Sequence, residues 1–153
     1  MQVAGRTISK YSVALLEIVL AGLLLRVYDL GVQSLVSDET YSVFLSKMSL
    51  SQMVQVTGAD VHPPLYYFIL HYWIALFGTS EVAVRVPSVL FGVLAIPVIY
   101  VLGRLLFKEE VGLLAALILA FSTFNVQYSQ DARMYSLMVL LALLSMYFFA
   151  RFL

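Results

Sequence analysis

The chain has 153 residues, of which 62% are hydrophobic and only 12% are charged. A soluble domain of this length carries about a quarter charged residues, is under half apolar and can bury only part of its surface. The composition therefore predicts a protein whose solvent is a lipid bilayer. Nine basic and nine acidic residues give a net charge of zero, which does not favour a nucleic-acid partner. The absence of cysteine excludes disulfides, thiolate metal sites and a cysteine nucleophile.

Apolar runs, taken in chain order, predict the membrane topology. The first extends from Tyr11 to Leu30 and follows a weakly basic start, so we expect an uncleaved signal anchor with a cytoplasmic N-terminus. Arg26, near the outer end of this run, can reach the headgroups by snorkelling. Four stretches approach the ~20 residues that a membrane-spanning helix requires. They are residues 12–30, 86–107, 111–126 and 134–153.

A fifth apolar run, residues 64–77, is too short to cross. Its length of about 14 residues covers roughly 21 Å, whereas the hydrocarbon core is ~30 Å thick. The run is rich in aromatic side chains, which favour the headgroup boundary. Four crossings place one set of ionisable side chains on the outer face, and five would split the set, so we choose four. The set is Asp38, Glu39, Asp60, His62, Glu81, Arg85, Asp131 and Arg133.

The predicted fold is therefore an all-α integral membrane protein with four transmembrane helices. We expect residues 1–153 to be the N-terminal transmembrane part of a larger architecture, with an outer loop at residues 31–85 and no soluble domain. Two helices in that loop are expected to lie along the membrane. The first has Ser37 as its N-cap, and the second is the aromatic run, launched by Pro63 and Pro64.

Asp38 and Glu39 are the first candidate catalytic residues. Adjacent side chains on a helix point about 100° apart, so both carboxylates cannot face one ligand. One can act as a base while its neighbour caps the helix or pairs with a cation. The alternative is an acid pair that only favours the start of a helix through the dipole.

Asp60 and His62 lie two residues apart on a backbone stiffened by Pro63 and Pro64. Residues before proline favour extended geometry, so both side chains can project to the same side. His62 can bind a phosphate or a sugar hydroxyl, or the segment can be a rigid lead-in to a helix. One histidine and one aspartate are too few for a zinc site. No metal ligand is therefore assigned, and dependence on a divalent metal stays open.

Two further polar segments follow. Glu81 and Arg85 have the i,i+4 spacing of a helical ion pair. Arg85 can snorkel to headgroups or bind a lipid-linked phosphate in bidentate fashion. The segment from Tyr128 to Tyr135 lies between two long apolar runs and holds glutamine, aspartate and arginine without glycine or proline. It is either an ordinary tight loop or, as we favour, part of a site, because ordinary loops are built from other residue types.

Four motifs in this order resemble the start of a group of membrane glycosyltransferases with the C-type fold. They are Asp38-Glu39, the segment from His62 to Tyr67, Arg85-Val86-Pro87-Ser88, and the segment from Tyr128 to Tyr135. The group includes the dolichyl-phosphate-mannose protein mannosyltransferases and their bacterial and archaeal relatives. The resemblance runs from about Leu15 to the end of the chain.

The resemblance implies the function and the site. A hexose or pentose would move from a dolichyl or undecaprenyl (polyprenyl) phosphate donor to a hydroxyl on a protein, lipid or glycan, on the outer face of the membrane. Asp38 would be the catalytic base and Glu39 would complete the acidic pair. Arg85 would bind the donor phosphate, and Asp131 with Arg133 would line the cavity. The predicted substrate-binding set also contains Asp60, His62, Tyr128 and Gln130.

In one respect the chain differs from the group it resembles. Members of the group have roughly twice as many crossings, so the isolated chain is expected to be inactive. The alternative function is a non-enzymatic membrane module, part of a transporter or an assembly scaffold, in which polar clusters line a path or bind neighbouring helices.

Overall fold

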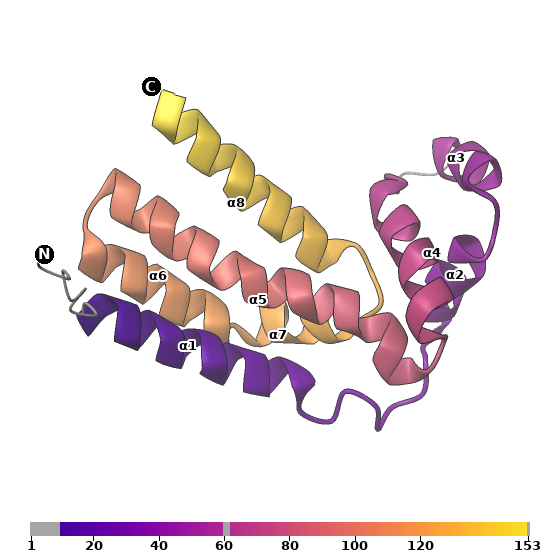
Figure 1. The fold of residues 1–153 in the computed structure, drawn as a ribbon, viewed down its shortest axis with the longest axis horizontal. Helices are drawn as coiled ribbons and strands as arrows, with labels where there is room; N and C mark the ends of the chain where they lie inside the picture. The colour runs from indigo at the N-terminus through magenta and orange to yellow at the C-terminus, as the bar shows by residue number, and fades with distance from the viewer. Residues whose placement is uncertain (1–9, 60–61, 153) are drawn as a thin grey trace, which may run out of the picture.

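The computed structural model describes residues 10–59 and 62–152, and this part of the chain is helical throughout its regular elements (Figure 1). The all-α prediction is confirmed. The eight helices are α1 Lys10–Val27, α2 Ser37–Ser46, α3 Leu50–Gly58, α4 Leu65–Phe77, α5 Glu81–Leu106, α6 Glu109–Phe121, α7 Thr123–Gln130 and α8 Tyr135–Phe152.

Two groups of helices make up the molecule. The longest helix, α5, packs against α1, α6, α7 and α8 to form a bundle. The three short helices α2, α3 and α4 gather beyond one end of the bundle, and the loop between α7 and α8 lies at that same end (Figure 1). The predicted outer loop therefore folds as a separate cap over one end of the bundle.

Among the described helices, α5 and α8 are long and apolar enough to cross a membrane. The bent pair α6 and α7 makes a third if it is counted as one span. The 18 residues of α1 include Lys10, Glu17 and Arg26, and α1 is not among these candidates. With 13 residues, α4 is an apolar helix below spanning length, as its sequence predicts.

The cap departs from prediction in two details. Val36, not Ser37, is the N-cap of α2, so the predicted cap is wrong by one residue. The helix α3 was not predicted, although its start has a recognisable capping box. The hydroxyl of Ser49 accepts a hydrogen bond from the backbone of Gln52, and the Gln52 side chain accepts one from the Ser49 amide.

The predicted third crossing, residues 111–126, is broken at Ser122. The axes of α6 and α7 meet there at 55°. The Ser122 hydroxyl accepts a hydrogen bond from the Asn125 amide and so starts a new helix at the break. A break of this kind leaves carbonyl groups at the end of α6 without helical partners.

Arg26 supplies donors to that break. It is fully buried, so it does not snorkel to the headgroups. Its two terminal nitrogens donate to the carbonyls of Leu119 and Ala120 at the end of α6, to that of Gly22 and to the Asn125 side chain, and Nε donates to Ser129. All five N–H groups of the guanidinium are therefore used. A cation at a helix C-terminus is also favoured by the helix dipole.

Glycine makes this junction possible. A Cβ added at Gly92 on α5 would lie 2.1 Å from Ser129 Oγ and 3.0 Å from Arg26 Nε. A Cβ at Gly22 on α1 would lie 2.5 Å from the side chain of Ile96. The close packing of α1, α5 and α7 therefore requires residues without a side chain at these two positions.

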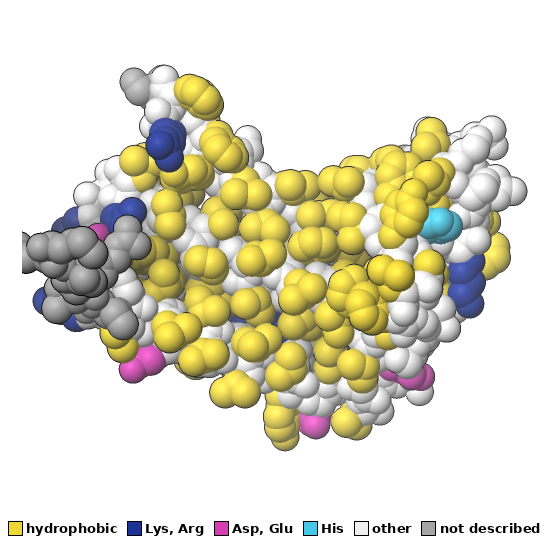
Figure 2. Space-filling model, viewed as in Figure 1, with side chains coloured by type: hydrophobic (Ala, Val, Ile, Leu, Met, Phe, Trp, Pro, Cys, Tyr) yellow, Lys and Arg dark blue, Asp and Glu magenta, His cyan; other side chains and the backbone are white. Residues whose placement is uncertain are grey.

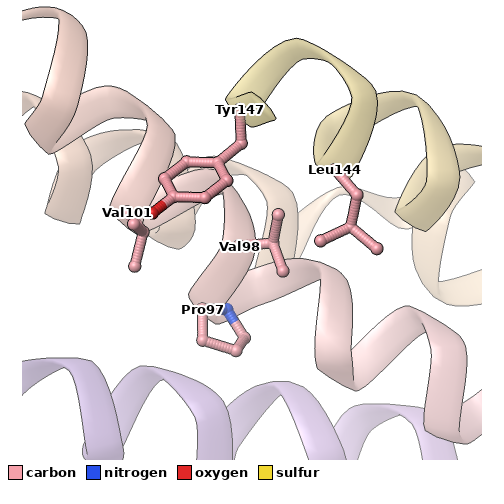
Figure 3. A pocket seen from close by; sticks show the side chains of 5 residues that line it. All are labelled: Pro97, Val98, Val101, Leu144 and Tyr147. Atoms are coloured by element: carbon pink, nitrogen blue, oxygen red, sulfur yellow. The ribbon is translucent and has the colours of Figure 1, made fainter. Parts of the chain in front are cut away.

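The surface of the bundle is apolar, as the composition predicts. Figure 2 shows hydrophobic side chains across the bundle face, with Lys and Arg towards the ends. Away from the cap, α8 diverges from α5 (Figure 1). An apolar pocket of about 280 Å³ lies between them, lined by Pro97, Val98, Val101, Leu144 and Tyr147 (Figure 3).

Candidate active site

The centre of the site is a buried ion pair between α2 and α5. Both side chains are almost inaccessible, and Nε and Nη2 of Arg85 each lie 2.8 Å from a carboxylate oxygen of Glu39. Glu39 also accepts hydrogen bonds from the backbone amides of Val36 and Ala132. Burial raises the pKa of Glu39, but these hydrogen bonds outweigh it and hold the pKa below its usual value. The ionised form of Glu39 is therefore stabilised by fixed donors, and Glu39 acts as a structural anchor.

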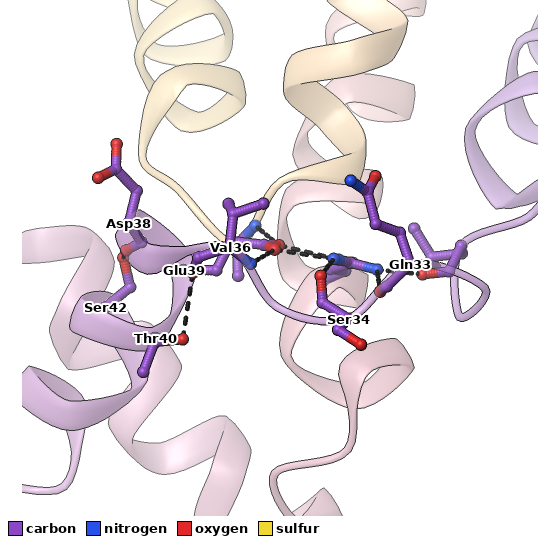
Figure 4. A network of polar contacts seen from close by, with 10 residues as sticks. Gln33, Ser34, Val36, Asp38, Glu39, Thr40 and Ser42 are labelled. Carbon is purple, nitrogen blue, oxygen red and sulfur yellow. Dashed lines mark hydrogen bonds and ion pairs between the residues drawn. The ribbon is translucent and has the colours of Figure 1, made fainter.

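Arg85 uses its remaining donors on the segment that joins α1 to α2. Nη1 donates to the carbonyls of Leu30 and Gln33, and Nη2 makes a longer hydrogen bond of 3.4 Å to the carbonyl of Ser34 (Figure 4). With the two bonds to Glu39, all five N–H groups are engaged. The predicted helical ion pair between Arg85 and Glu81 is wrong, because Glu39 is the partner among the described residues.

Asp38 lies beside this pair but faces the other way. Its side chain is 71% exposed and points away from the contacts around Glu39 (Figure 4). This arrangement agrees with the prediction that the two neighbouring carboxylates cannot share one ligand. A carboxylate oxygen of Asp38 lies 3.8 Å from Nη2 of Arg133.

Arg133 is a buried cation with donors to spare. Its Nη1 makes a long hydrogen bond of 3.4 Å to the Asp38 carbonyl, and its guanidinium lies 5.8 Å from the centre of the Tyr135 ring. Its buried Nε has no hydrogen-bond partner among the described residues. A buried N–H without a partner costs about 1–3 kcal/mol, so Arg133 is suited to accept a further anionic partner.

Two successive hydrogen bonds, which the sequence did not suggest, fix the backbone of Arg133; we call them the relay. The Tyr66 hydroxyl on α4 lies 2.9 Å from the Ser88 hydroxyl on α5, which in turn donates to the Arg133 carbonyl at 3.1 Å. All three residues are buried. The relay connects the cap, the bundle and the α7–α8 loop.

Asp131 lies two residues before Arg133, at the C-terminal end of α7. Burial and the nearby Glu39 carboxylate raise the pKa of Asp131, although Arg85 and Arg133 act in the opposite direction. It lines a polar pocket of about 120 Å³ together with Arg85 and Gln130. In the described part of the chain, no group of three or more histidine, aspartate and glutamate side chains is suited to hold a metal ion.

The remaining predicted residues have other surroundings. Gln130 Nε2 donates to the carbonyls of Tyr28, Leu25 and Arg26 at the end of α1. The ring of Tyr128 packs against Phe124 and Tyr135.

At the start of the segment before α4, His62 is half-buried, and a substrate-binding role for it stays a prediction. Asp60 lies outside the described residues.

Comparison with known proteins identifies the family. The sequence model described as dolichyl-phosphate-mannose-protein mannosyltransferase matches residues 61–153, which is more than half of the chain. No curated protein and no solved structure matches the chain. The matched segment contains Arg85, Asp131 and Arg133, while Asp38 and Glu39 precede it. The chain therefore belongs to the dolichyl-phosphate-mannose-protein mannosyltransferase family, which comprises glycosyltransferases that depend on a lipid-phosphate sugar.

Proposed function

We propose that this chain carries the catalytic base and the phosphate ligand of a glycosyltransferase that acts on the outer face of the membrane. The enzyme moves a hexose or pentose from a polyprenyl-phosphate donor to a hydroxyl acceptor. One observation carries the proposal: an exposed carboxylate, Asp38, lies 3.8 Å from a buried arginine, Arg133, whose Nε has no partner among the described residues.

In the proposed displacement, Asp38 acts on the attacking acceptor hydroxyl and Arg133 acts on the leaving phosphate. Asp38 takes the proton from the acceptor hydroxyl, whose oxygen attacks the anomeric carbon of the sugar. The bond from that carbon to the phosphate oxygen breaks on the opposite face, so the sugar is transferred with inversion. The lipid phosphate leaves with the electron pair, and Arg133 stabilises its negative charge.

We assign Arg85 a positioning role instead of the phosphate contact implied by the resemblance. Its N–H groups are all used by Glu39 and by three backbone carbonyls, so binding a phosphate would require several hydrogen bonds to break. By clamping the α1–α2 segment and Glu39, Arg85 fixes the start of the helix that presents Asp38.

The proposed topology has four crossings, with α1 as the additional span. A charge within a membrane helix is costly unless it is buried against partners. Arg26 meets that condition through five hydrogen bonds inside the bundle. Lys10 and Glu17 lie in the first half of α1, towards the proposed cytoplasmic end.

The test is Asp38→Asn introduced in the native membrane. Transfer of a radiolabelled sugar from polyprenyl phosphate to hydroxyl acceptors should fall by about 10²–10⁴-fold, the usual contribution of a general base. The variant should accumulate to the wild-type level, because the Asp38 side chain is exposed. Glu81→Gln is the matched control, since Glu81 is an exposed carboxylate at the start of α5, outside the proposed site. Unchanged transfer in Asp38→Asn would refute the enzyme and favour the transporter or scaffold module.

A further inference from the structure

A second recess lies beside the site, between the segment that follows α1 and the helix α7. It has a volume of about 120 Å³, which is below the range of drug-sized ligand pockets and leaves room for one small ring. Six of its seven lining residues have polar side chains. The seven are Asp29, Leu30, Gln33, Arg85, Gln127, Gln130 and Asp131.

Some side chains of this lining are held by hydrogen bonds, and others have hydrogen-bonding groups that are free of any described partner. Arg85 is held by five hydrogen bonds, and the Gln130 amide nitrogen donates to three carbonyls of the α1 end. The side chains of Gln33, Gln127 and Asp131 make no hydrogen bond within the described part of the chain. A rigid wall that carries unused donors and acceptors is preorganised for a polar ligand.

The charge of the pocket indicates which polar ligand it suits. Its one cation is already neutralised by Glu39, and two of its other members, Asp29 and Asp131, are acidic. A phosphate would therefore be repelled. A divalent metal is also disfavoured, because these residues do not form a group of three or more suitable ligands. A neutral ligand with several hydroxyls remains, since carboxamides both donate and accept and carboxylates accept from O–H groups.

We propose that this pocket binds the hydroxyl groups of a neutral saccharide ring, with Gln127, Gln33 and Asp131 as its ligands. The inference rests on the proposed function and deepens it. Asp131 and Arg133 are two residues apart in the α7–α8 loop, so one loop would contact both parts of the substrate. Arg133 takes the phosphate on one side, and Asp131 takes sugar hydroxyls on the other.

Saturation-transfer-difference NMR on the full chain in detergent tests the pocket directly. The probes are methyl α-mannopyranoside, methyl α-glucopyranoside and methyl β-xylopyranoside, with tetrahydropyran-2-methanol as a ring that lacks ring hydroxyls. At least one pyranoside should give saturation transfer to the wild type. Gln127→Met should weaken that transfer several-fold, because it keeps the size of an exposed side chain and removes its amide.

The matched control is Gln55→Met, which makes the same change at an exposed position on α3. It should bind as the wild type does. The pocket assignment is overturned if no pyranoside binds, if Gln127→Met binds as well as Gln55→Met, or if tetrahydropyran-2-methanol saturates as strongly as the pyranosides.

A competition arm separates the two sources of such a ring. A short-chain polyprenyl-phosphate mannose should displace the free pyranoside if the pocket holds the donor sugar, and should leave it bound if the pocket holds an acceptor sugar. The proposed function is judged separately, by transfer in Asp38→Asn. If transfer survives there while Gln127→Met loses binding, the pocket stands and the reaction fails; the reverse result rejects the pocket alone.

Discussion

At Asp38 and Glu39, two neighbouring carboxylates of the same chemistry have opposite environments. The Asp38 side chain is 71% exposed, whereas that of Glu39 is 1% exposed and binds Arg85. The sequence predicts an acid pair on a helix and the divergence of its two side chains. It does not predict which carboxylate is buried, because the partners of Glu39 are Arg85 and Ala132, which lie 46 and 93 residues further along the chain.

This difference predicts opposite effects of two similar substitutions. Glu39→Gln leaves Arg85 as a buried charge without its counter-ion, which typically costs about 3–5 kcal/mol. Asp38→Asn changes an exposed group and removes only its 3.8 Å ion pair with Arg133, so it should cost no more than about 1 kcal/mol. Thermal unfolding of the purified chain in detergent measures both. Equal unfolding midpoints for the two variants would contradict the assignment of Glu39 as an anchor.

Asp131 predicts a pH dependence of stability. Its pKa in the folded chain is raised above its usual value, so the folded state binds more protons than the unfolded state between the two pKa values. The stability contributed by Asp131 is therefore lost as the pH rises through the folded pKa. Asp131→Asn removes this loss, so the variant should gain stability relative to the wild type as the pH rises from about 4 to 7.

Unfolding midpoints at several pH values, compared between variant and wild type, measure that gain. Asp29→Asn is the control, because Asp29 lines the same pocket and is exposed. A difference between Asp131→Asn and the wild type that is independent of pH would show that the raised pKa is absent.

Among the helices, those set by long apolar runs could be predicted, and those set by short-range capping or distant contacts could not. The long helices α5 and α8 match predicted runs to within a few residues, apart from the first turn of α5. The cap helix α3 was missed, although Ser49 and Gln52 form a capping box that the sequence displays. The break at Ser122 was missed because Arg26, about 100 residues earlier, supplies the donors that stabilise it.

The close packing of α1, α5 and α7 predicts the effect of a larger residue at Gly92. In Gly92→Ala, the new methyl group would lie 2.1 Å from Ser129 Oγ, so Ser129 and Arg26 must move. Overpacking of this kind costs about 1–3 kcal/mol. The control is Gly58→Ala, since a Cβ at Gly58 meets nothing within 4 Å. If both variants unfold at the wild-type temperature in detergent, α1 and α7 do not pack as closely as described.

For the molecule as a whole, the sequence predicts that acids and arginines separated along the chain gather at one end. The contacts of Glu39 with Arg85 and of Asp38 with Arg133 confirm this gathering. The lengths of the apolar runs and the positions of the charges suffice for that conclusion, because successive crossings place every second loop on the same face. The pairing of particular charges could not be predicted, since it depends on how the cap seats on the bundle.

The proposed orientation is tested by cysteine labelling, which the absence of native cysteine makes clean. Single substitutions Ser37→Cys, Thr79→Cys and Gln127→Cys, all at exposed positions, should react with an impermeant maleimide added outside intact cells. Lys108→Cys, in the exposed turn between α5 and α6, should react only after the cells are opened. Labelling of Gln127→Cys from the inside alone would mean that α4 crosses the membrane.

The buried position of Arg26 has a consequence for biosynthesis. An arginine raises the free energy of inserting a membrane helix, by about 2.5–3.5 kcal/mol at the helix centre and by less near an end, where Arg26 lies in α1. Its acceptors at Leu119, Ala120, Asn125 and Ser129 are synthesised roughly 5–20 s later, at the usual 5–20 residues per second. During that interval Arg26, on the proposed span α1, lacks most of its hydrogen-bond partners. In the proposed topology, Arg26 therefore gains its partners on α6 and α7 only after those helices have emerged.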